Sequence, residues 1–161
     1  MIVYRVSQRK RSKDLSGRGA FKVGGRWSNK GVHALYTAMN ASLAAWEVFV
    51  HQITKEEWPS EYCLIAIQIP DRHKDILRVS IKTLPRNWDE LPYSSAVQQL
   101  GKVWFDKNKL AVIVPSAVMK GEFNVILNPL HTQFKSLVKI TRVENFQFDE
   151  RLKSGYLWKQ S

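Results

Sequence analysis

Short hydrophobic stretches, separated by polar turns, recur along the chain and predict a sheet built from short strands. Runs of four to eight apolar and β-branched residues bounded by turn residues are typical of strands. Such runs stand at residues 2–6, 32–38, 62–69, 76–81, 110–114, 124–127 and 137–143. Pro70, Pro115 and Pro129 lie at or just beyond the ends of three of them. Proline lacks the backbone donor that a strand ladder needs, so these positions predict strand ends.

Two segments predict helices instead. Asn40 or Ser42 is a suitable N-cap for a helix that runs to about Ile53, and residues 94–106 predict a second helix. Residues 7–29 are rich in charged and small residues and predict a long loop, which in a compact domain is usually functional or mobile. Strands and helices do not alternate regularly, which argues against a doubly wound parallel sheet. The pattern predicts an α+β fold in one domain, with a mixed sheet and few helices.

Size and composition agree with a compact protein that folds around its own core. The chain has 161 residues, of which 44% are hydrophobic. It contains no apolar run of about 18 residues that would predict a membrane span, and its first residues lack the apolar segment of a secretory signal. The single cysteine, Cys63, lies among apolar residues and is expected to be a reduced core residue. We therefore expect a cytoplasmic protein.

The positive charge is concentrated at the start of the chain. The first 30 residues hold a net charge of +8 out of +11 for the whole chain, with Asp14 as their one acidic residue. The basic residues are Arg5, Arg9, Lys10, Arg11, Lys13, Arg18, Lys22, Arg26 and Lys30. A basic surface of this kind attracts nucleic acid, phosphate-bearing metabolites or an acidic partner protein, or is simply solvated.

Glu47 is the most informative single residue. It is the only Asp, Glu, Lys or Arg between Lys30 and Lys55, and it interrupts an otherwise apolar helical stretch. On a helical wheel it borders an apolar arc that contains Leu43 and Trp46, together with positions 50 and 53. A carboxylate buried there needs a partner or a purpose, because burial of an unpaired charge is costly. Two interpretations remain open: an ion pair with an arginine that ties the helix to the sheet, or a catalytic carboxylate.

Four further segments carry polar groups at strand ends or in glycine-containing turns, where rigid scaffolds often place functional groups. Gly25 lets the backbone approach a ligand, and the planar Arg26 guanidinium beside it suits phosphate. The candidate residues in these segments are Gly25, Arg26 and Trp27, then Tyr36, then Ser116, and finally Asn128 and His131. Each segment alone also has an ordinary structural interpretation as a turn or a half-buried side chain.

Taken in order, these segments resemble the RES domain family. The order is Gly-Gly-Arg-Trp, Tyr-Thr-Ala, a helix with Ala-x-x-Glu, Val-Pro-Ser and Asn-Pro-x-His. The arginine, glutamate and serine that give the family its name match Arg26, Glu47 and Ser116. The resemblance assigns residues 1–150 to this domain and leaves 151–161 as a C-terminal tail. It implies a split sheet similar to the ADP-ribosyltransferase fold.

The resemblance also implies a function. RES proteins are toxins of bacterial toxin–antitoxin pairs that consume NAD by hydrolysis or phosphorolysis, or ADP-ribosylate a protein. The expected partner is an Xre-type helix-turn-helix antitoxin that covers the active site. NAD is then a substrate, and we expect no metal, because the four histidines lack ligand spacing.

The implied chemistry gives each candidate residue a role. Glu47 would stabilise the cationic ribose that forms as nicotinamide leaves. The pyrophosphate or a ribose hydroxyl would be held by Arg26, with the backbone of Gly25 nearby. Tyr36 would stack against nicotinamide or line the ribose pocket, and Ser116 would form a hydrogen bond with a phosphate or the carboxamide. The remaining candidates are Trp27 for stacking, Asn128 and His131 for support, and Arg5 as a further anion contact.

A basic nucleic-acid-binding module is the rival interpretation. It rests on the charged first 30 residues, in which Tyr4, Phe21 and Trp27 are interleaved as possible stacking platforms. No helix-turn-helix or RNA-recognition signature accompanies them, and this interpretation leaves Glu47 unexplained.

Overall fold

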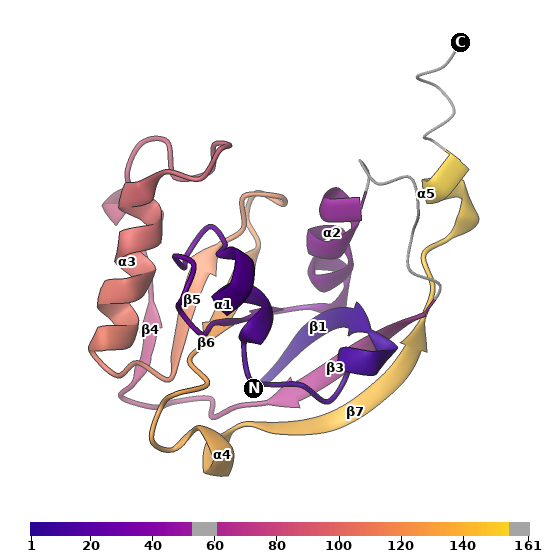
Figure 1. Ribbon diagram of the computed structural model, residues 1–161, viewed down its shortest axis with the longest axis horizontal. Coiled ribbons are helices and arrows are strands. Elements are labelled where there is room, and N and C mark those ends of the chain that lie inside the picture. The colour runs from indigo at the N-terminus through magenta and orange to yellow at the C-terminus, as the bar shows by residue number, and fades with distance from the viewer. Residues whose placement is uncertain (53–60, 155–161) are drawn as a thin grey trace.

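The computed structural model describes residues 1–52 and 61–154, and within them seven strands form one mixed sheet (Figure 1). The strands are β1 (Ile2–Gln8), β2 (Leu35–Ala38), β3 (Tyr62–Gln68), β4 (Ile76–Arg78), β5 (Ala111–Pro115), β6 (Phe123–Leu127) and β7 (Lys139–Phe146). Their order across the sheet is β4-β5-β6-β2-β1-β3-β7. The β4–β5 pair is parallel, and every other pair is antiparallel. The predicted strands are confirmed to within a few residues at their ends.

The helices are few and short, as the pattern predicts. They are α1 (Arg18–Val23), α2 (Ala41–Gln52), α3 (Ser95–Asp106), α4 (Phe134–Leu137) and α5 (Glu150–Ser154), with 3-10 turns η1 (Arg9–Arg11) and η2 (Ile81–Thr83). The predicted long loop over residues 7–29 is wrong in detail, because η1 and α1 lie within it. Helix α1 has only six residues and lies between Gly17 and Gly24, both with positive φ. A helix of six residues is too short to be recognised from the periodicity of its apolar residues.

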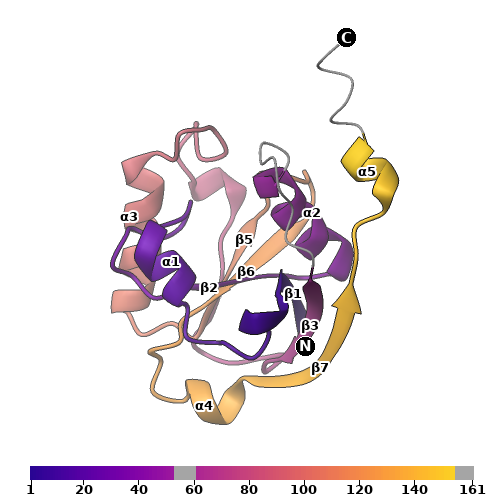
Figure 2. The ribbon, with the colours of Figure 1, turned by 45° about the vertical axis from the view of Figure 1, so that its right-hand side comes forward.

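The sheet consists of two halves that meet at a narrow junction. Strands β1 and β2 are joined through one residue pair, Tyr4 and Ala38. Strand β2 pairs along its whole length with β6, whereas β1 pairs along its whole length with β3. We call the line between β1 and β2 the seam. In Figures 1 and 2, α3 lies toward the β4 end of the sheet and β7 forms the opposite edge.

Hydrophobic side chains fill both faces of the sheet. On one face, Ile65, Ile113 and Val125 belong to a core cluster that Phe134 of α4 completes. The other face is covered in two places. Val97 of α3 packs with residues of β5 and β6 in one cluster, and helix α2 packs with β1 and β2 in another.

Helix α2 buries only part of the arc predicted from its helical wheel. Its buried residues include Leu43, Ala44 and Phe49, whereas Trp46 is 38% exposed. The helix is apolar around most of its circumference, so the wheel did not single out one face. Position 53, also assigned to that arc, lies outside the described residues. No helix in the described part of the chain has the length and apolar character needed to cross a membrane.

Candidate active site

Glu47 is held by two neutral hydrogen-bond donors from the neighbouring β5–β6 hairpin. Its Oε1 accepts a hydrogen bond of 2.9 Å from the Ser116 hydroxyl and a short one of 2.5 Å from the Asn124 amide. Both donors bond to the same carboxylate oxygen. Among the described residues, Oε2 accepts no hydrogen bond. Glu47 is half-buried, so this second oxygen is the one available to a ligand.

The direction of the Ser116 hydroxyl is fixed by its other contacts. The Ser116 oxygen accepts backbone hydrogen bonds of 3.1 Å from both Val118 and Met119. A serine hydroxyl has two acceptor positions and one hydrogen. With both acceptor positions occupied, the hydrogen is committed to Glu47. Ser116 therefore acts as a positioning group for this carboxylate and, in this arrangement, does not offer its hydrogen to a ligand.

Asn124 is the site residue that the sequence interpretation missed. It is the second residue of β6, is buried, and points its amide nitrogen at Glu47. Its carbonyl oxygen Oδ1 is buried and has no partner among the described residues. The sequence feature that could have identified Asn124 is an amide side chain within the predicted strand 124–127, whose remaining residues are apolar.

Tyr36 organises the glycine-containing turn at 25–28. Its hydroxyl accepts a hydrogen bond of 3.0 Å from the backbone of Trp27 and shares one of 2.9 Å with the Ser28 hydroxyl. A Cβ on Gly25 would lie 2.5 Å from the Tyr36 oxygen, so only glycine fits here without a shift. Burial raises the pKa of Tyr36 to about 12, against the opposing effect of these hydrogen bonds. The phenol is therefore neutral and able to donate at physiological pH.

The register of the sheet brings Tyr36 close to the Glu47 group. Tyr36 lies opposite Ile126 and Ala38 lies opposite Asn124. Alternate residues of a strand share a face, so Tyr36 and Asn124 are diagonal neighbours, with a typical spacing of about 7–8 Å. The Tyr36 phenol and the Glu47 carboxylate, which Asn124 holds, therefore occupy the same face of the sheet.

Arg26 makes contacts different from those predicted for it. Its guanidinium donates hydrogen bonds of 2.7 Å and 2.9 Å to the backbone carbonyls of Trp88 and Glu90, and it lies over the Tyr93 ring at 4.8 Å. It thereby fastens the segment 88–93 to the turn at 25–28. Within the described residues, the donors to Glu47 are a hydroxyl and an amide, and no arginine forms an ion pair with it.

Trp27 is a core residue, so the stacking role predicted for it does not fit the structure. Its side chain is only 2% exposed and packs between Trp88 and Trp104, with ring centroids 5.8 Å and 5.7 Å away. Large aromatic side chains of this kind anchor an element through buried area. Trp27 therefore fixes the turn that carries Arg26, and its ring does not face a ligand.

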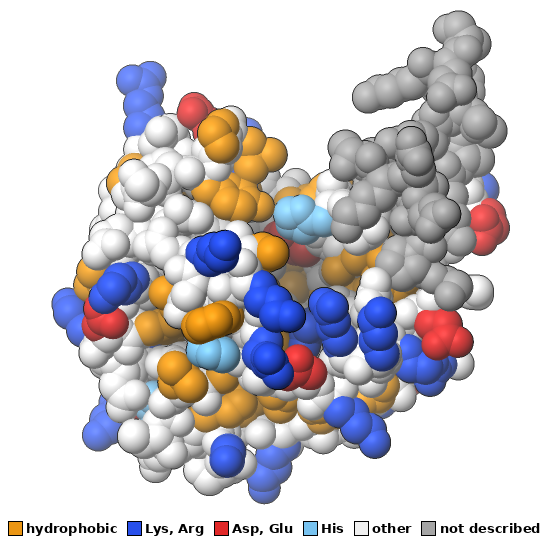
Figure 3. Space-filling view, in the orientation of Figure 1, with side chains coloured by type: hydrophobic (Ala, Val, Ile, Leu, Met, Phe, Trp, Pro, Cys, Tyr) orange, Lys and Arg blue, Asp and Glu red, His pale blue; other side chains and the backbone are white. Residues whose placement is uncertain are grey.

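A basic cleft of about 370 Å³ opens at the seam. Arg5 of β1 and Tyr36 of β2 line it from the two halves of the sheet, and Arg11, Arg18 and Lys22 add positive charge. Figure 3 shows Lys and Arg side chains gathered beside a hollow near the middle of this face. This volume lies within the range of small-molecule sites.

Arg5 is the most enclosed of these cations. Its guanidinium donates a hydrogen bond of 2.7 Å to the backbone carbonyl of Asp14. Burial lowers the pKa of Arg5, the nearby Asp14 carboxylate opposes this, and the positive charge of Arg11 adds to it. An arginine is nonetheless charged at neutral pH. The enclosed charge at the seam is thus a predicted anion contact that the structure places in a cleft.

Asn128 and His131 lie at the opposite end of the β5–β6 hairpin from Ser116. The Asn128 side chain accepts a hydrogen bond from the backbone of Leu130, and the backbone of Asn128 donates to Leu110, which precedes β5. Ser116 instead follows the last residue of β5. The structure therefore does not bring Asn128 or His131 together with Glu47, and their contacts among the described residues lie elsewhere.

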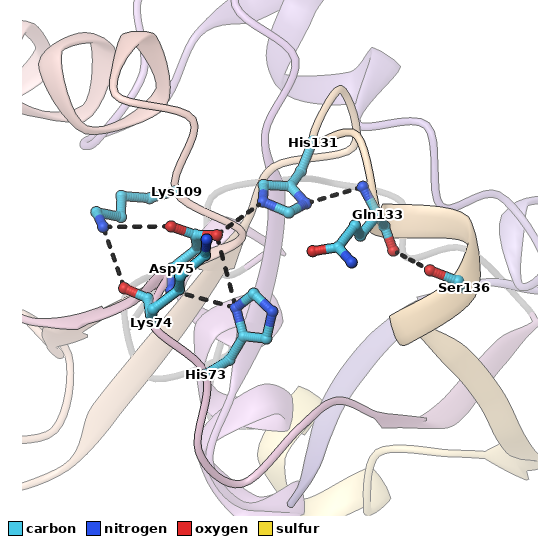
Figure 4. Close-up of polar contacts among 7 residues, drawn as sticks. All are labelled: His73, Lys74, Asp75, Lys109, His131, Gln133 and Ser136. Atoms are coloured by element: carbon cyan, nitrogen blue, oxygen red, sulfur yellow. Dashed lines mark hydrogen bonds and ion pairs between the residues drawn. The ribbon is translucent and has the colours of Figure 1, made fainter.

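His131 belongs to a separate polar cluster around Asp75 (Figure 4). The Asp75 carboxylate lies 3.5 Å from His131 Nε2, 3.7 Å from His73 Nδ1 and 3.5 Å from Lys109 Nζ. His131 Nδ1 accepts a backbone hydrogen bond of 3.1 Å from Gln133, and its Nε2 faces the Asp75 carboxylate. The cluster fastens the start of β4 to the segment after β6. Within the described residues, no group of three potential ligand side chains is arranged to hold a metal ion.

Comparisons with known proteins agree with this architecture. A family model described as the RES domain matches residues 2–149. The chain is 38% identical over 154 residues to "Toxin Res" of Photorhabdus laumondii, across 94% of this chain and 97% of that protein. It is 33% identical over 141 residues to "Prs ADP-ribosylating toxin" of a Sphingobium species, across 86% of each chain.

The fold also matches a solved structure. A chain in the crystal structure of the M. tuberculosis MbcT–MbcA toxin–antitoxin complex superimposes with a TM-score of 0.74, covering 98% of this chain and 87% of that one. The identity between the two chains is 19%, so this match concerns the fold alone. The family model and the sequence relatives span nearly the whole chain. The protein described here belongs to the RES domain family.

Proposed function

We propose that this protein is the toxin of a toxin–antitoxin pair and that it cleaves the bond between nicotinamide and ribose in NAD. The observation that carries the proposal is the Glu47 carboxylate, whose Oε1 is held by Ser116 and Asn124 while Oε2 stays free among the described residues. Such an anion is fixed before the substrate arrives. Preorganised charge of this kind is often the largest single contribution to catalysis.

The chemistry of the substrate explains why one carboxylate suffices. Nicotinamide leaves as a neutral group from a positively charged ring, so its departure needs no general acid. The ribose that remains develops oxocarbenium character, as in glycoside hydrolysis. Glu47 Oε2 would stabilise this positive charge or accept a hydrogen bond from a ribose hydroxyl. The two donors on Oε1 would keep the carboxylate in position without neutralising it.

The cleft at the seam would hold the rest of the dinucleotide. Its cations would face the anionic pyrophosphate, and Arg5 contributes the most enclosed charge. The neutral phenol of Tyr36 would donate a hydrogen bond at the ribose or the nicotinamide. Arg26 would contribute as a nearby positive charge and as the group that holds segment 88–93 in place.

A second candidate reaction is the transfer of ADP-ribose to a protein. One relative, 33% identical to this chain, is named as an ADP-ribosylating toxin. The same Glu47 geometry serves both reactions, because the bond that breaks is the same and only the acceptor differs. Water, phosphate and a protein side chain are the three acceptors to be compared.

An antitoxin is the proposed partner, and we propose the Xre-type helix-turn-helix class, bound over the active site. A solved structure with this fold is a toxin–antitoxin complex. A protein bound over the seam would close the basic cleft and exclude NAD. In the rival interpretation, nucleic acid would bind to the same cations, and its affinity would fall steeply as the salt concentration rises.

The deciding measurement is nicotinamide release from NAD by the purified protein, with and without phosphate. Glu47→Gln keeps an oxygen for Ser116 and Asn124 to bond but removes the charge, so release is expected to fall at least about 100-fold. Glu144→Gln, an exposed change on β7, is the matched control. Expression without antitoxin is expected to arrest bacterial growth for the wild type and the control, and not for Glu47→Gln.

The outcomes separate the candidate functions. Release that requires phosphate names phosphorolysis, and release without it names hydrolysis. Release that appears only when a cell extract supplies a protein acceptor names ADP-ribosylation. Equal release by the wild type and Glu47→Gln would refute the assigned role of Glu47.

A further inference from the structure

A second pair of side chains links helix α2 to the β5–β6 hairpin, two helical turns before Glu47. Asn40 Nδ2 donates a hydrogen bond of 2.7 Å to the carboxylate of Glu122. Asn40 also caps α2, because its Oδ1 accepts a hydrogen bond of 2.7 Å from the backbone of Leu43. One side chain therefore begins the helix and fastens it to the hairpin.

Glu122 is connected in turn to the serine that holds Glu47. Its backbone carbonyl accepts a hydrogen bond of 2.8 Å from the backbone of Ser116, which closes the turn between β5 and β6. Glu122 is two residues before Asn124, the other donor to Glu47. The backbone that carries both donors is thus bound directly to the N-terminus of α2.

The spacing along α2 makes this link a constraint on Glu47. Asn40 and Glu47 are seven residues apart, which is two turns of an α-helix, so both lie on the same side of α2 and about 10 Å apart along it. The helix is therefore attached to the hairpin at two points on one side. Two such points fix the direction of the helix axis relative to the hairpin, which one point alone would leave free.

We propose that Asn40 and Glu122 are positioning residues for catalysis: their hydrogen bond holds Glu47 in register with Ser116 and Asn124. This inference rests on the proposed function. Neither residue is assigned a contact with NAD. Their effect reaches the reaction through the orientation of α2, and loss of the link misplaces the carboxylate relative to the ribose. A misplacement of about 1 Å can cost on the order of 100-fold in rate.

The chain offers a test that leaves the helix cap intact. Asp is as good an N-cap as Asn, so Asn40→Asp keeps the bond to Leu43 but sets two carboxylates against each other. Glu122→Gln keeps an oxygen that accepts from Asn40. In the double variant Asn40→Asp/Glu122→Gln, the glutamine amide donates to the aspartate, so the hydrogen bond is restored with its direction reversed.

For Asn40→Asp we expect kcat for nicotinamide release to fall about 10- to 100-fold with KM changed less than about 3-fold. The double variant is expected to recover kcat to within about 3-fold of Glu122→Gln. Asn145→Asp, which adds the same charge on exposed β7, is the control. An unchanged kcat in Asn40→Asp, or no recovery in the double variant, would overturn the proposal.

A second readout does not depend on activity. The side-chain amide of Asn124 reports its bond to Glu47 through its proton and nitrogen chemical shifts. These shifts are expected to move in Asn40→Asp and to return in the double variant, while the melting temperature stays close to that of Asn145→Asp. If the wild type releases no nicotinamide, the proposed function fails and the Asn124 shifts still decide the positioning role. Unmoved shifts would overturn it.

Discussion

Asn124 shows how a neutral side chain can orient a charged one without offsetting its charge. An arginine next to Glu47 would hold the carboxylate more strongly, but it would also offset the negative charge that an oxocarbenium ion requires. A hydroxyl and an amide orient the carboxylate and leave its charge available. This choice of donors is consistent with a group that acts on a transient cation.

Replacing Asn124 by aspartate is therefore expected to be more harmful than its small size change suggests. The variant sets a second carboxylate beside Glu47, and one of two adjacent carboxylates holds its proton to higher pH. We expect kcat/KM at neutral pH to fall at least about 10-fold and the acidic limb of the pH–rate profile to move upward. Asn145→Asp serves as the control, and a profile equal to that of the wild type would contradict the assignment.

At the scale of elements, helix α3 is fitted against the turn that carries Arg26. Gly101 lies where a Cβ would be 1.6 Å from the backbone oxygen of Trp27. Gln98, one turn earlier, donates a hydrogen bond of 2.9 Å to the carbonyl of Gly25. Helix α3 therefore contacts the turn at two places. The backbone at Gly101 lies against Trp27, and the side chain of Gln98 bonds to Gly25.

A methyl group at position 101 is expected to push α3 and this turn apart. Alanine is the better helix former, so any loss must come from overpacking. We expect Gly101→Ala to lower the free energy of unfolding by at least about 2 kcal/mol in urea titrations. Gly19→Ala in α1 is the matched change, since no atom lies within 4 Å of its added Cβ. Equal free energies of unfolding for the two variants would contradict this, because the turn would then move aside at no energetic cost.

The pattern of the chain predicted elements better than it predicted their arrangement. Strand runs such as 62–69 and the cap at Asn40 are local features, and the structure confirms them. The short helix α1 and the orientation of α2 were not recoverable, because six residues carry no periodicity and an apolar helix has no distinct face. The meeting of Asn124 with Glu47 depends on the register between β2 and β6 and on how α2 lies across them.

The prediction of candidate site residues shows the same difference between local sequence features and three-dimensional arrangement. Motif order brought Glu47 and Ser116 together correctly, since the structure joins them by a hydrogen bond. It also grouped His131 with them, although that residue lies at the far end of the hairpin. Trp27 was mistaken for a stacking surface because sequence does not distinguish a buried aromatic residue from an exposed one.

At the scale of the whole molecule, the Asp75 cluster ties distant segments together and gives stability a dependence on pH. Burial tends to raise the pKa of Asp75, but the adjacent His131 side chain, the hydrogen bond from Lys109 and the positive charges of Lys109 and Lys74 outweigh it, so the pKa lies below its ordinary value. A lowered pKa stabilises the folded state above the ordinary carboxyl pKa of about 4. This stabilisation is lost as the pH falls below that value.

Asp75→Asn is accordingly expected to be less stable than the wild type at pH 7, with the difference shrinking as the pH falls from about 5 to 3. Urea titrations across this range measure the effect. Asp89→Asn is the control, because Asp89 is exposed and its side chain has no ion pair within the described residues. A difference that stays constant with pH would show that the lost contacts, and not the charge of Asp75, matter.

The single residue pair that joins β1 to β2 also has a thermodynamic consequence. Most of the backbone along the seam contributes no ladder hydrogen bonds between the halves. Unfolding of one half is therefore only weakly coupled to unfolding of the other along this line. A molecule lodged between Arg5 and Tyr36 would supply the missing linkage. Occupancy of the cleft would then appear as slower amide hydrogen exchange in both halves at once, even in strands that the bound molecule never touches.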